Sequence, residues 1–147
     1  MLKESLNKWL KIDPISIIRQ VLSDRAILNW IEEANRKQLL TGKNSFDVKL
    51  SDIGGGYSDF TLQLNPNKQR DVVNLLDTSE FYASITAKVD TSLLEIDADP
   101  IKTDDNGKDT NLYDRWGEDI LGLNEEHLQE LIDTLKDKLI IEILKKV

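Results

Sequence analysis

The sequence predicts a single α+β domain in which a small antiparallel sheet of four to five strands is covered by a long N-terminal helix and a C-terminal helix. Apolar residues recur at helical spacing near both ends of the chain, and between these ends they alternate with polar residues as in strands. The 147 residues are enough for one hydrophobic core and few for two. With 39% apolar and 31% charged residues, the composition is that of an ordinary water-soluble protein.

Residues 1–12 are predicted to form an N-terminal arm or short helix ahead of the domain proper, which spans residues 13–147. The apolar residues of this segment lie along one side of a helix: Leu2, Leu6, Trp9 and Leu10. The segment either packs as a short helix or becomes ordered only against a partner.

A long helix is expected over residues 13–41. Asp13 can cap its free backbone N–H groups, and Pro14 suits the first helical position, where no N–H group is needed. Ser23-Asp24 can interrupt this helix by capping a second one. Gly42 stands where a C-terminal cap belongs.

The sheet is expected between residues 45 and 98, where the period of the apolar residues changes. Four short segments show strand-like alternation, with these apolar residues: Phe46, Val48 and Leu50; Phe60, Leu62 and Leu64; Ile85, Ala87 and Val89; Leu94, Ile96 and Ala98. Asp90-Thr91-Ser92 is predicted to close a hairpin between the last two segments. Gly54-Gly55-Gly56 is expected to be a flexible loop, because its spacing is not that of a phosphate-binding motif.

Residues 97–110 are predicted to form an exposed acidic loop, and residues 111–146 to form the C-terminal helices. The loop suggests a calcium site, but aligning Gly107 with the invariant glycine of a calcium loop puts Lys102 and Tyr113 where acidic ligands are required. A solvated loop is therefore expected. Asn124 is predicted to cap the final helix, whose first turn is acidic and whose last turn is basic, as the helix dipole favours.

Composition argues against several classes of function. The net charge of −8 disfavours binding to nucleic acid or to anionic membranes. No apolar run is long enough for a bilayer span, and the first residues lack the features of a signal peptide. Because the chain has no cysteine and His127 is its single histidine, no metal site is predicted, and His127 is interpreted as a surface residue. No carboxylate pair is set apart by apolar neighbours, so we expect neither a cofactor nor enzymatic activity.

Aromatic residues are the candidate contacts with other proteins, since large rings anchor cores and interfaces. In the segment VNLLDTSEFYASITAKV, a polar elbow at residues 77–79 is followed directly by an aromatic pair. The candidate contact residues along the whole chain are Trp9, Tyr57, Phe81, Tyr82 and Trp116. Trp116 is expected to be exposed because a loop precedes it.

Three segments, NRKQLLTGKNS, DTSEFYASI and LYDRWGEDILGLNEEHLQELI, carry short motifs of one group of proteins. They resemble small structural proteins encoded in Bacteroidetes phages and prophages and, more distantly, head–tail joining and tail-completion proteins of long-tailed phages. The resemblance covers about residues 26–140. Ser79 stands where glycine is usual in this group, so the elbow is not expected to rest on a residue with positive φ. The acidic insertion around Gly107 is also longer than in the group.

The resemblance implies a non-enzymatic virion protein, a head–tail connector (neck) or tail-completion component that assembles as a ring, or onto one, around the DNA passage. Its implied partners are connector, portal or tail subunits and further copies of itself. Its implied location is the virion, and the host cytoplasm before assembly. Phe81 and Tyr82 would pack where the elbow leads into the sheet, with the Tyr82 hydroxyl in water.

Two other functions are compatible with the sequence. The negative charge also suits an acidic binding or regulatory protein that presents carboxylates to a basic partner in place of DNA phosphates. A hydrolase would need a deep pocket lined by two of four acids: Asp77, Glu80, Glu118 and Asp119.

Overall fold

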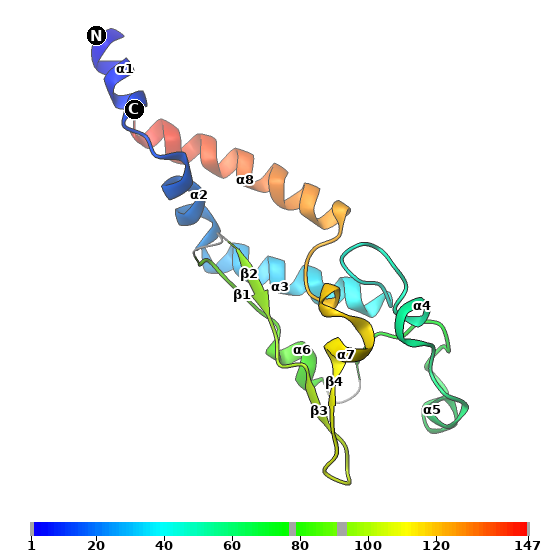
Figure 1. Cartoon of the computed structure of the whole chain (residues 1–147). Helices are drawn as coiled ribbons and strands as arrows, with labels where there is room; N and C mark the ends of the chain where they lie inside the picture. Colours follow the sequence, from blue (N-terminus) through cyan, green and yellow to red (C-terminus); the bar gives the residue numbers. More distant parts are fainter. Residues whose placement is uncertain (1, 77–78, 91–93, 147) are drawn as a thin grey trace.

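The computed structural model describes residues 2–76, 79–90 and 94–146, and it is mostly helical with two small antiparallel sheets (Figure 1). The helices and strands in chain order are α1 (Leu2–Leu10), α2 (Pro14–Leu22), α3 (Arg25–Leu40), α4 (Leu50–Gly54), α5 (Asp59–Leu64), α6 (Glu80–Ser84), β1 (Thr86–Lys88), β2 (Glu95–Asp97), β3 (Ile101–Thr103), β4 (Asp109–Asn111), α7 (Leu112–Trp116), the 3-10 turn η1 (Glu118–Ile120) and α8 (Glu125–Lys146). The α+β class predicted from the sequence is confirmed.

The expected single sheet of four to five strands is wrong for the described residues, which form two separate pairs of strands. In the first sheet β1 pairs with β2, and Ala87 lies opposite Ile96. In the second sheet β3 pairs with β4, and Lys102 lies opposite Thr110. The first hairpin lies where the alternating pattern predicted it, although Thr91 and Ser92 of its predicted turn lie outside the described residues.

Residues 46–50, predicted as a strand, form a turn that leads into α4. The side-chain oxygen of Asn44 accepts the N–H groups of Phe46 at 2.9 Å and of Val48 at 3.1 Å. A polar side chain that bonds its own neighbouring backbone competes with strand formation. Apolar alternation across so few residues is therefore overridden by the turn.

Residues 60–64, also predicted as a strand, lie in α5. Ser58 caps this helix, because its hydroxyl oxygen accepts the N–H of Thr61 at 3.2 Å. Phe60 and Leu64 are four positions apart, which is the spacing of one helix face as well as of a strand face. The period of a short apolar run does not separate these two structures.

The predicted helix over residues 13–41 is divided into α2 and α3 at Ser23-Asp24, as its capping signal indicated. Asp13 and Asp24 each accept the N–H of the residue two positions further on, at 3.1 Å and 2.9 Å. Asn124 begins α8, and its side-chain oxygen accepts the N–H of His127 at 2.9 Å. These local predictions are confirmed.

The segment 97–110, predicted as a loop, contains the β3–β4 hairpin. The Asp104 carboxylate accepts the N–H groups of Asn106 and Lys108, both at 2.9 Å, and Gly107 has a φ of +79°. Asn-Gly between two strands is a strong turn signal, because both residues tolerate positive φ. This signal at residues 106–107 identifies the hairpin inside an otherwise acidic and polar stretch.

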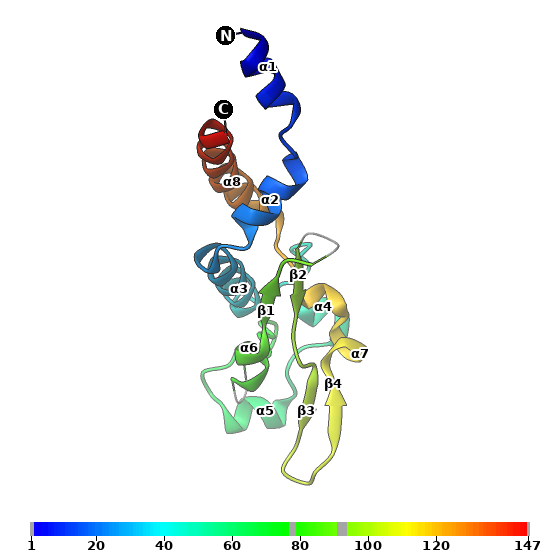
Figure 2. The same ribbon diagram turned by 90° about the vertical axis from the view of Figure 1, so that its left-hand side faces the viewer.

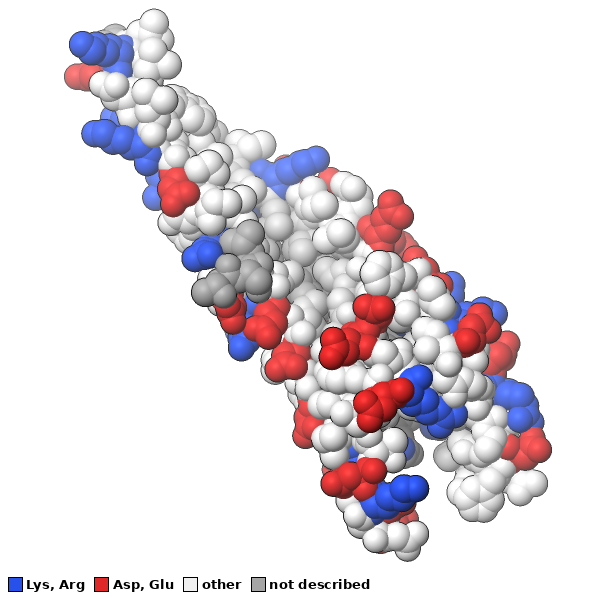
Figure 3. All heavy atoms as spheres, in the orientation of Figure 1, with Lys and Arg blue, Asp and Glu red and all other residues white. Residues whose placement is uncertain are grey.

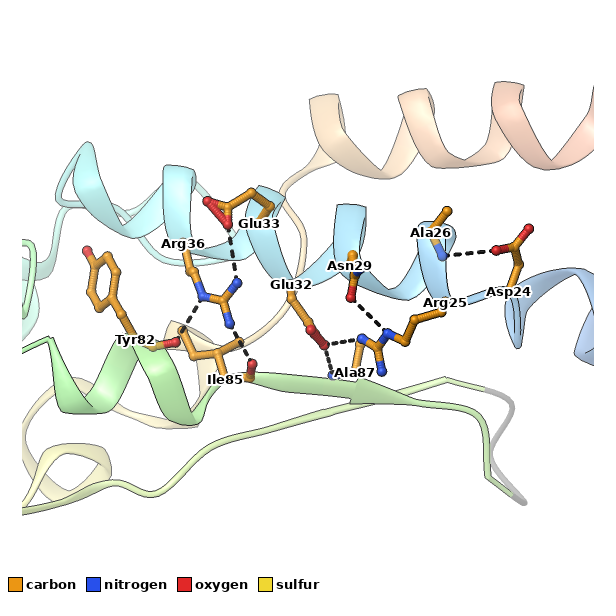
Figure 4. Close-up of polar contacts among 10 residues, drawn as sticks. All are labelled: Asp24, Arg25, Ala26, Asn29, Glu32, Glu33, Arg36, Tyr82, Ile85 and Ala87. Atoms are coloured by element: carbon orange, nitrogen blue, oxygen red, sulfur yellow. Dashed lines mark hydrogen bonds and ion pairs between the residues drawn. The ribbon is translucent and has the colours of Figure 1, made fainter.

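Helix α3 supplies hydrogen-bond partners to backbone just before and within β1 (Figure 4). The Glu32 carboxylate accepts the N–H of Ala87 at 3.2 Å. The Arg36 guanidinium donates to the carbonyls of Tyr82 and Ile85, both at 2.9 Å. Buried backbone groups must be paired, and here helix side chains pair the N–H of Ala87 and the carbonyls of Tyr82 and Ile85. On this side of β1, α3 therefore lies where a third strand would have to pair.

The same helix also holds the irregular segment between α7 and α8. The side-chain amide of Asn35 donates to the carbonyl of Ile120 at 3.0 Å and accepts the N–H of Gly122 at 2.9 Å. Gln38 accepts the N–H of Asn124 at 2.7 Å. Buried amides that bond backbone at both ends fix the path of a loop that has no regular structure of its own.

Two apolar clusters make up the core, one on each end of α3. The first cluster contains Leu39, Leu50, Val73, Phe81, Tyr82, Ile85, Leu112, Trp116 and Ile120. The second cluster contains Leu22, Ile27, Leu28, Ile31, Ala87 and Leu131, and in this part of the molecule α8 packs on α2. Within the described residues no helix is long and apolar enough to cross a membrane.

Helix α1 buries none of its residues and extends away from both clusters (Figures 1 and 2). Both views place the end of α8 at this same end of the molecule. That part of α8 also exposes large apolar side chains, at Ile140, Ile141 and Leu144. We call α1 together with these three residues the apolar end.

Candidate functional site

A groove of about 500 Å³ lies between α5 and the β3–β4 hairpin, and we call it the hairpin groove. Figure 3 shows it as a hollow between two projections at the lower edge of the molecule. Its apolar lining residues include Tyr57, Phe60, Leu64, Phe81, Ile101 and Trp116. Phe60, Leu64 and Ile101 are exposed at its rim, whereas Phe81 and Trp116 are buried.

Tyr57 forms one wall and is held on several sides. Its hydroxyl donates to the side-chain oxygen of Asn74 at 3.1 Å and accepts the Asn74 N–H at 3.2 Å. The Lys68 ammonium lies 4.6 Å from the centre of its ring, which is a cation–π distance. Its backbone N–H donates to the carbonyl of Arg70 at 2.9 Å. The ring is therefore fixed before any partner arrives.

The glycine run 54–56 is a packed junction rather than the flexible loop expected from the sequence. A Cβ on Gly56 would lie 2.5 Å from the carbonyl oxygen of Arg70, and a Cβ on Gly54 would lie 2.8 Å from the indole nitrogen of Trp116. Only glycine allows such close approach of backbone to its neighbours. The run brings the Tyr57 wall of the groove close to α7.

Phe81 and Tyr82 pack edge to face, with ring centres 6.4 Å apart and an angle of 72° between the rings. Both rings are buried in the first core cluster, so the Tyr82 hydroxyl is not in water as expected. It donates to the carbonyl of Asn74 at 2.6 Å. Burial, and secondly the nearby Tyr57, raise the pKa of Tyr82 well above its ordinary value.

Ser79 has a φ of +67°, so the expectation that the elbow avoids a residue with positive φ is wrong. A left-handed conformation is uncommon for serine and strains the backbone modestly. Ser79 precedes α6, and the carbonyl of Ser79 accepts the N–H of Ala83 at 2.9 Å. Asp77 and Thr78, the rest of the predicted elbow, lie outside the described residues.

The expectation that Trp116 is exposed is wrong, since it is buried in the first core cluster. The Arg115 guanidinium lies 4.5 Å from the centre of its ring and covers it. The same guanidinium donates to the carbonyl of Gly54 at 2.7 Å. Trp116 is therefore a buried wall of the hairpin groove, with Arg115 over its ring.

Three of the five predicted contact residues, Tyr57, Phe81 and Trp116, line this one groove. Tyr82 lies behind the Tyr57 wall and is joined to it through Asn74. Trp9 is on α1, and it is not among the residues that line the groove. An interface role for these five residues stays a prediction.

Sequence reasoning missed the rim residues Phe60, Leu64 and Ile101. Phe60 and Leu64 were assigned to a sheet and Ile101 to a solvated loop. Because all three side chains are exposed, the apolar residues at these positions do not belong to the hydrophobic core. Two local signals point to the elements that hold these residues. Ser58 is a helix-capping residue followed by Phe60 and Leu64, four positions apart, which indicates a helix. Asn-Gly after Ile101 indicates a hairpin.

The charges that line the hairpin groove are mixed: Lys68, Lys102 and Arg115 against Glu80 and Asp104. A groove that offers apolar surface together with charges of both signs is suited to bind a polypeptide segment. The described part of the chain holds no group of three or more His, Cys, Asp or Glu side chains that could hold a metal ion.

Of the four acids considered for a hydrolase, the three that the structure describes do not meet in one deep pocket. Glu80 lines the hairpin groove, whereas Glu118 and Asp119 line a different groove in which both carboxylates are exposed. Asp77 lies outside the described residues. His127, interpreted as a surface residue, is half-buried with its ring 6.3 Å from that of Trp30, edge to face.

Comparison of the chain with models of protein families, with curated proteins and with solved structures gave no match.

Proposed function

We propose that the chain is a non-enzymatic structural protein of a phage virion. Within the virion it is a head–tail connector (neck) or tail-completion component that assembles as a ring, or onto one, around the DNA passage. The observation that carries the proposal is the hairpin groove, in which three predicted contact aromatics meet beneath an exposed apolar rim. The resemblance of three segments to phage structural proteins supports the virion assignment.

The hairpin groove is suited to hold a segment of another protein. Phe60, Leu64 and Ile101 expose apolar surface that gains free energy when a partner covers it, about 25 cal/mol per Å². The walls behind them are pre-organised by the bonds of Tyr57 to Asn74, so little conformational entropy is lost on binding. At protein–protein interfaces, apolar pockets of this kind hold the anchoring side chains of a partner.

The overall charge is compatible with a position beside DNA. At −8 the chain repels a second polyanion at short range, so DNA can pass along its surface without being held. Figure 3 shows acidic side chains spread over the visible face, with basic side chains between them.

The proposal is tested by mass spectrometry of purified phage particles produced by a host that carries the gene. We expect peptides of this chain at a constant ratio to portal and tail proteins across independent preparations. Absence of the chain from complete, infectious particles would overturn the proposal.

The groove itself is tested with the substitutions F60D and F46D. Phe60 and Phe46 are 69% and 72% exposed, so both variants should fold, but only Phe60 lies on the rim. Losing the burial of one phenyl ring against a partner weakens binding by about 10- to 100-fold. We expect F60D to be lost from particles and F46D to be incorporated normally. Equal incorporation of the two would contradict a docking role for the groove.

The alternative, an acidic protein that binds a basic partner in place of DNA, is favoured by one observation. Asp97, Glu118 and Asp119 line a common groove, and none of the described residues that line it is basic. Binding of this kind weakens steeply with salt, because exposed charges are screened. A tight complex with a DNA-binding protein, competed by duplex DNA at low salt, would favour the alternative over the virion proposal.

A further inference from the structure

A second groove, of about 580 Å³, lies between β2, residues 113–123 and the start of α8. We call it the acidic groove. Its apolar floor includes Leu94, Leu121 and Leu128, and its charged residues are Asp97, Glu118 and Asp119. Leu128, near the start of α8, is exposed. The groove therefore combines apolar surface with three carboxylates.

The electrostatic potential of the acidic groove is negative. Lys, Arg and His are absent from the described residues that line it, and its three carboxylates are all exposed. Burial, followed by the negative charges of Asp97, Glu118 and Asp99, raises the pKa of Tyr113, which also lines the groove. Such a surface favours an apolar ligand that carries positive charge.

Helix α1 has the complementary properties. Its apolar stripe is exposed along its whole length and consists of Leu2, Leu6, Trp9 and Leu10. Residues 2–11 also carry three lysines against one acid, Glu4. A helix of nine residues that buries nothing is not stable on its own in water, so this segment requires a partner surface.

We propose that α1 of one copy of the chain lies in the acidic groove of a second copy. The apolar stripe of α1 covers the floor at Leu121 and Leu128, and Lys3, which flanks the stripe, faces the carboxylates at the rim. In Figures 1 and 2 the helix points away from α7, and no described residue of α1 lines the groove of its own chain. This contact rests on the assembly role proposed above and names one of the interfaces through which copies associate.

Because α1 and the acidic groove are different surfaces, the contact is head-to-tail. A head-to-tail contact repeats from copy to copy and gives a closed ring or an open filament. A single helix covers less area than the roughly 1,200 Å² of a stable interface, so each contact is weak in solution. Repetition around a ring raises the effective strength without new contacts.

Cross-linking between single-cysteine variants tests the contact, since the natural chain has no cysteine. A tagged L6C variant is mixed with L128C, or with I53C as the control, in the presence of a short bis-maleimide reagent. Leu128 and Ile53 are 46% and 45% exposed, but Leu128 lies in the acidic groove whereas Ile53 lines neither groove. We expect the L6C–L128C product to form at least about fivefold faster than the L6C–I53C product.

A charge swap tests whether the carboxylates of the acidic groove attract the Lys3 side chain of α1. Introducing E118K and D119K beside L128C should slow the cross-link about fivefold, since two attractions become repulsions. Introducing K3E beside L6C, in the same mixture, should restore the rate. The three altered side chains are exposed, so these variants keep the fold.

Three results would overturn this contact: a dominant L6C–L6C product, which means that two α1 helices pair with each other; equal rates with L128C and I53C; or no product at high protein concentration. The virion test is independent of these results. If particles contain the chain but the cross-link does not form, only the contact between α1 and the acidic groove is ruled out. If the cross-link forms specifically but particles lack the chain, only the virion proposal is ruled out.

Discussion

Helices α3 and α1 are both amphipathic, yet α3 buries eight of its residues and α1 buries none. Three of the buried residues of α3 are polar: Glu32, Asn35 and Gln38. Each of them bonds backbone from a distant part of the chain, so α3 packs against segments that need its side chains. Helix α1, in contrast, has no buried polar residue that could hold distant backbone in this way.

An apolar stripe therefore does not by itself determine whether a helix is buried. For α3 the decision comes from irregular backbone, around residues 82–87 and 120–124, that must be hydrogen-bonded. For α1 the stripe has the same chemistry, but none of its residues is buried in the part of the chain that the structure describes.

Replacing Leu39 by alanine should lower the free energy of unfolding by about 3 kcal/mol. Leu39 is fully buried in the first core cluster, so the substitution removes apolar burial and leaves a cavity. Urea denaturation followed by circular dichroism measures the change. A loss below about 1 kcal/mol would mean that the end of α3 is not packed as described.

Replacing Asn35 by alanine should cost about 2 kcal/mol, because it leaves the carbonyl of Ile120 and the N–H of Gly122 without partners. The matched control is N29A on the same helix, since Asn29 is exposed and its side chain bonds Arg25 at the surface. We expect N29A to cost less than about 0.5 kcal/mol. Equal losses for the two variants would show that the buried amide does not hold the segment before α8.

Local chemistry made several elements predictable from the sequence. Asp13, Asp24 and Asn124 cap helices because each side chain reaches an N–H group two or three positions further on. Such contacts depend on few residues, so a pattern specifies them. The contact that closes one side of β1 depends instead on Arg36 reaching the carbonyl of Ile85, 49 positions away, and no local pattern records that contact.

The candidate site was predictable in part for the same reason. Tyr57, Phe81 and Trp116 stand out as large rings whatever the fold, and they do line one groove. The burial of Trp116 was not predictable, since it depends on close approach at Gly54 and on the Arg115 side chain. Nor did the sequence show that α5 and the β3–β4 hairpin would face each other across that groove.

Replacing Tyr82 by phenylalanine should cost about 1 kcal/mol at neutral pH, through loss of its hydrogen bond to Asn74. The pH dependence is more specific. Because the folded-state pKa of Tyr82 is raised, the unfolded chain ionises first, and the natural protein loses stability as pH rises above about 10. The variant lacks this loss, by up to about 1 kcal/mol per pH unit.

Urea denaturation of both proteins between pH 9 and pH 11 measures the difference. Tyr113, whose pKa is also raised, is present in both proteins and cancels from the comparison. Parallel pH profiles would show that the Tyr82 hydroxyl is accessible to water, as the sequence had suggested.

Replacing Leu6 by alanine should have the smallest effect, within about 0.3 kcal/mol of the natural chain at low protein concentration. The substitution matches that of Leu39, but Leu6 is 53% exposed where Leu39 is fully buried. Alanine also favours helix slightly more than leucine does, so α1 loses no intrinsic propensity. At concentrations where copies associate, L6A should instead weaken self-association measured by sedimentation, since the deleted side chain belongs to the stripe that covers the acidic groove. A large loss of stability in the dilute monomer would place Leu6 against its own chain and remove the contrast between α1 and α3.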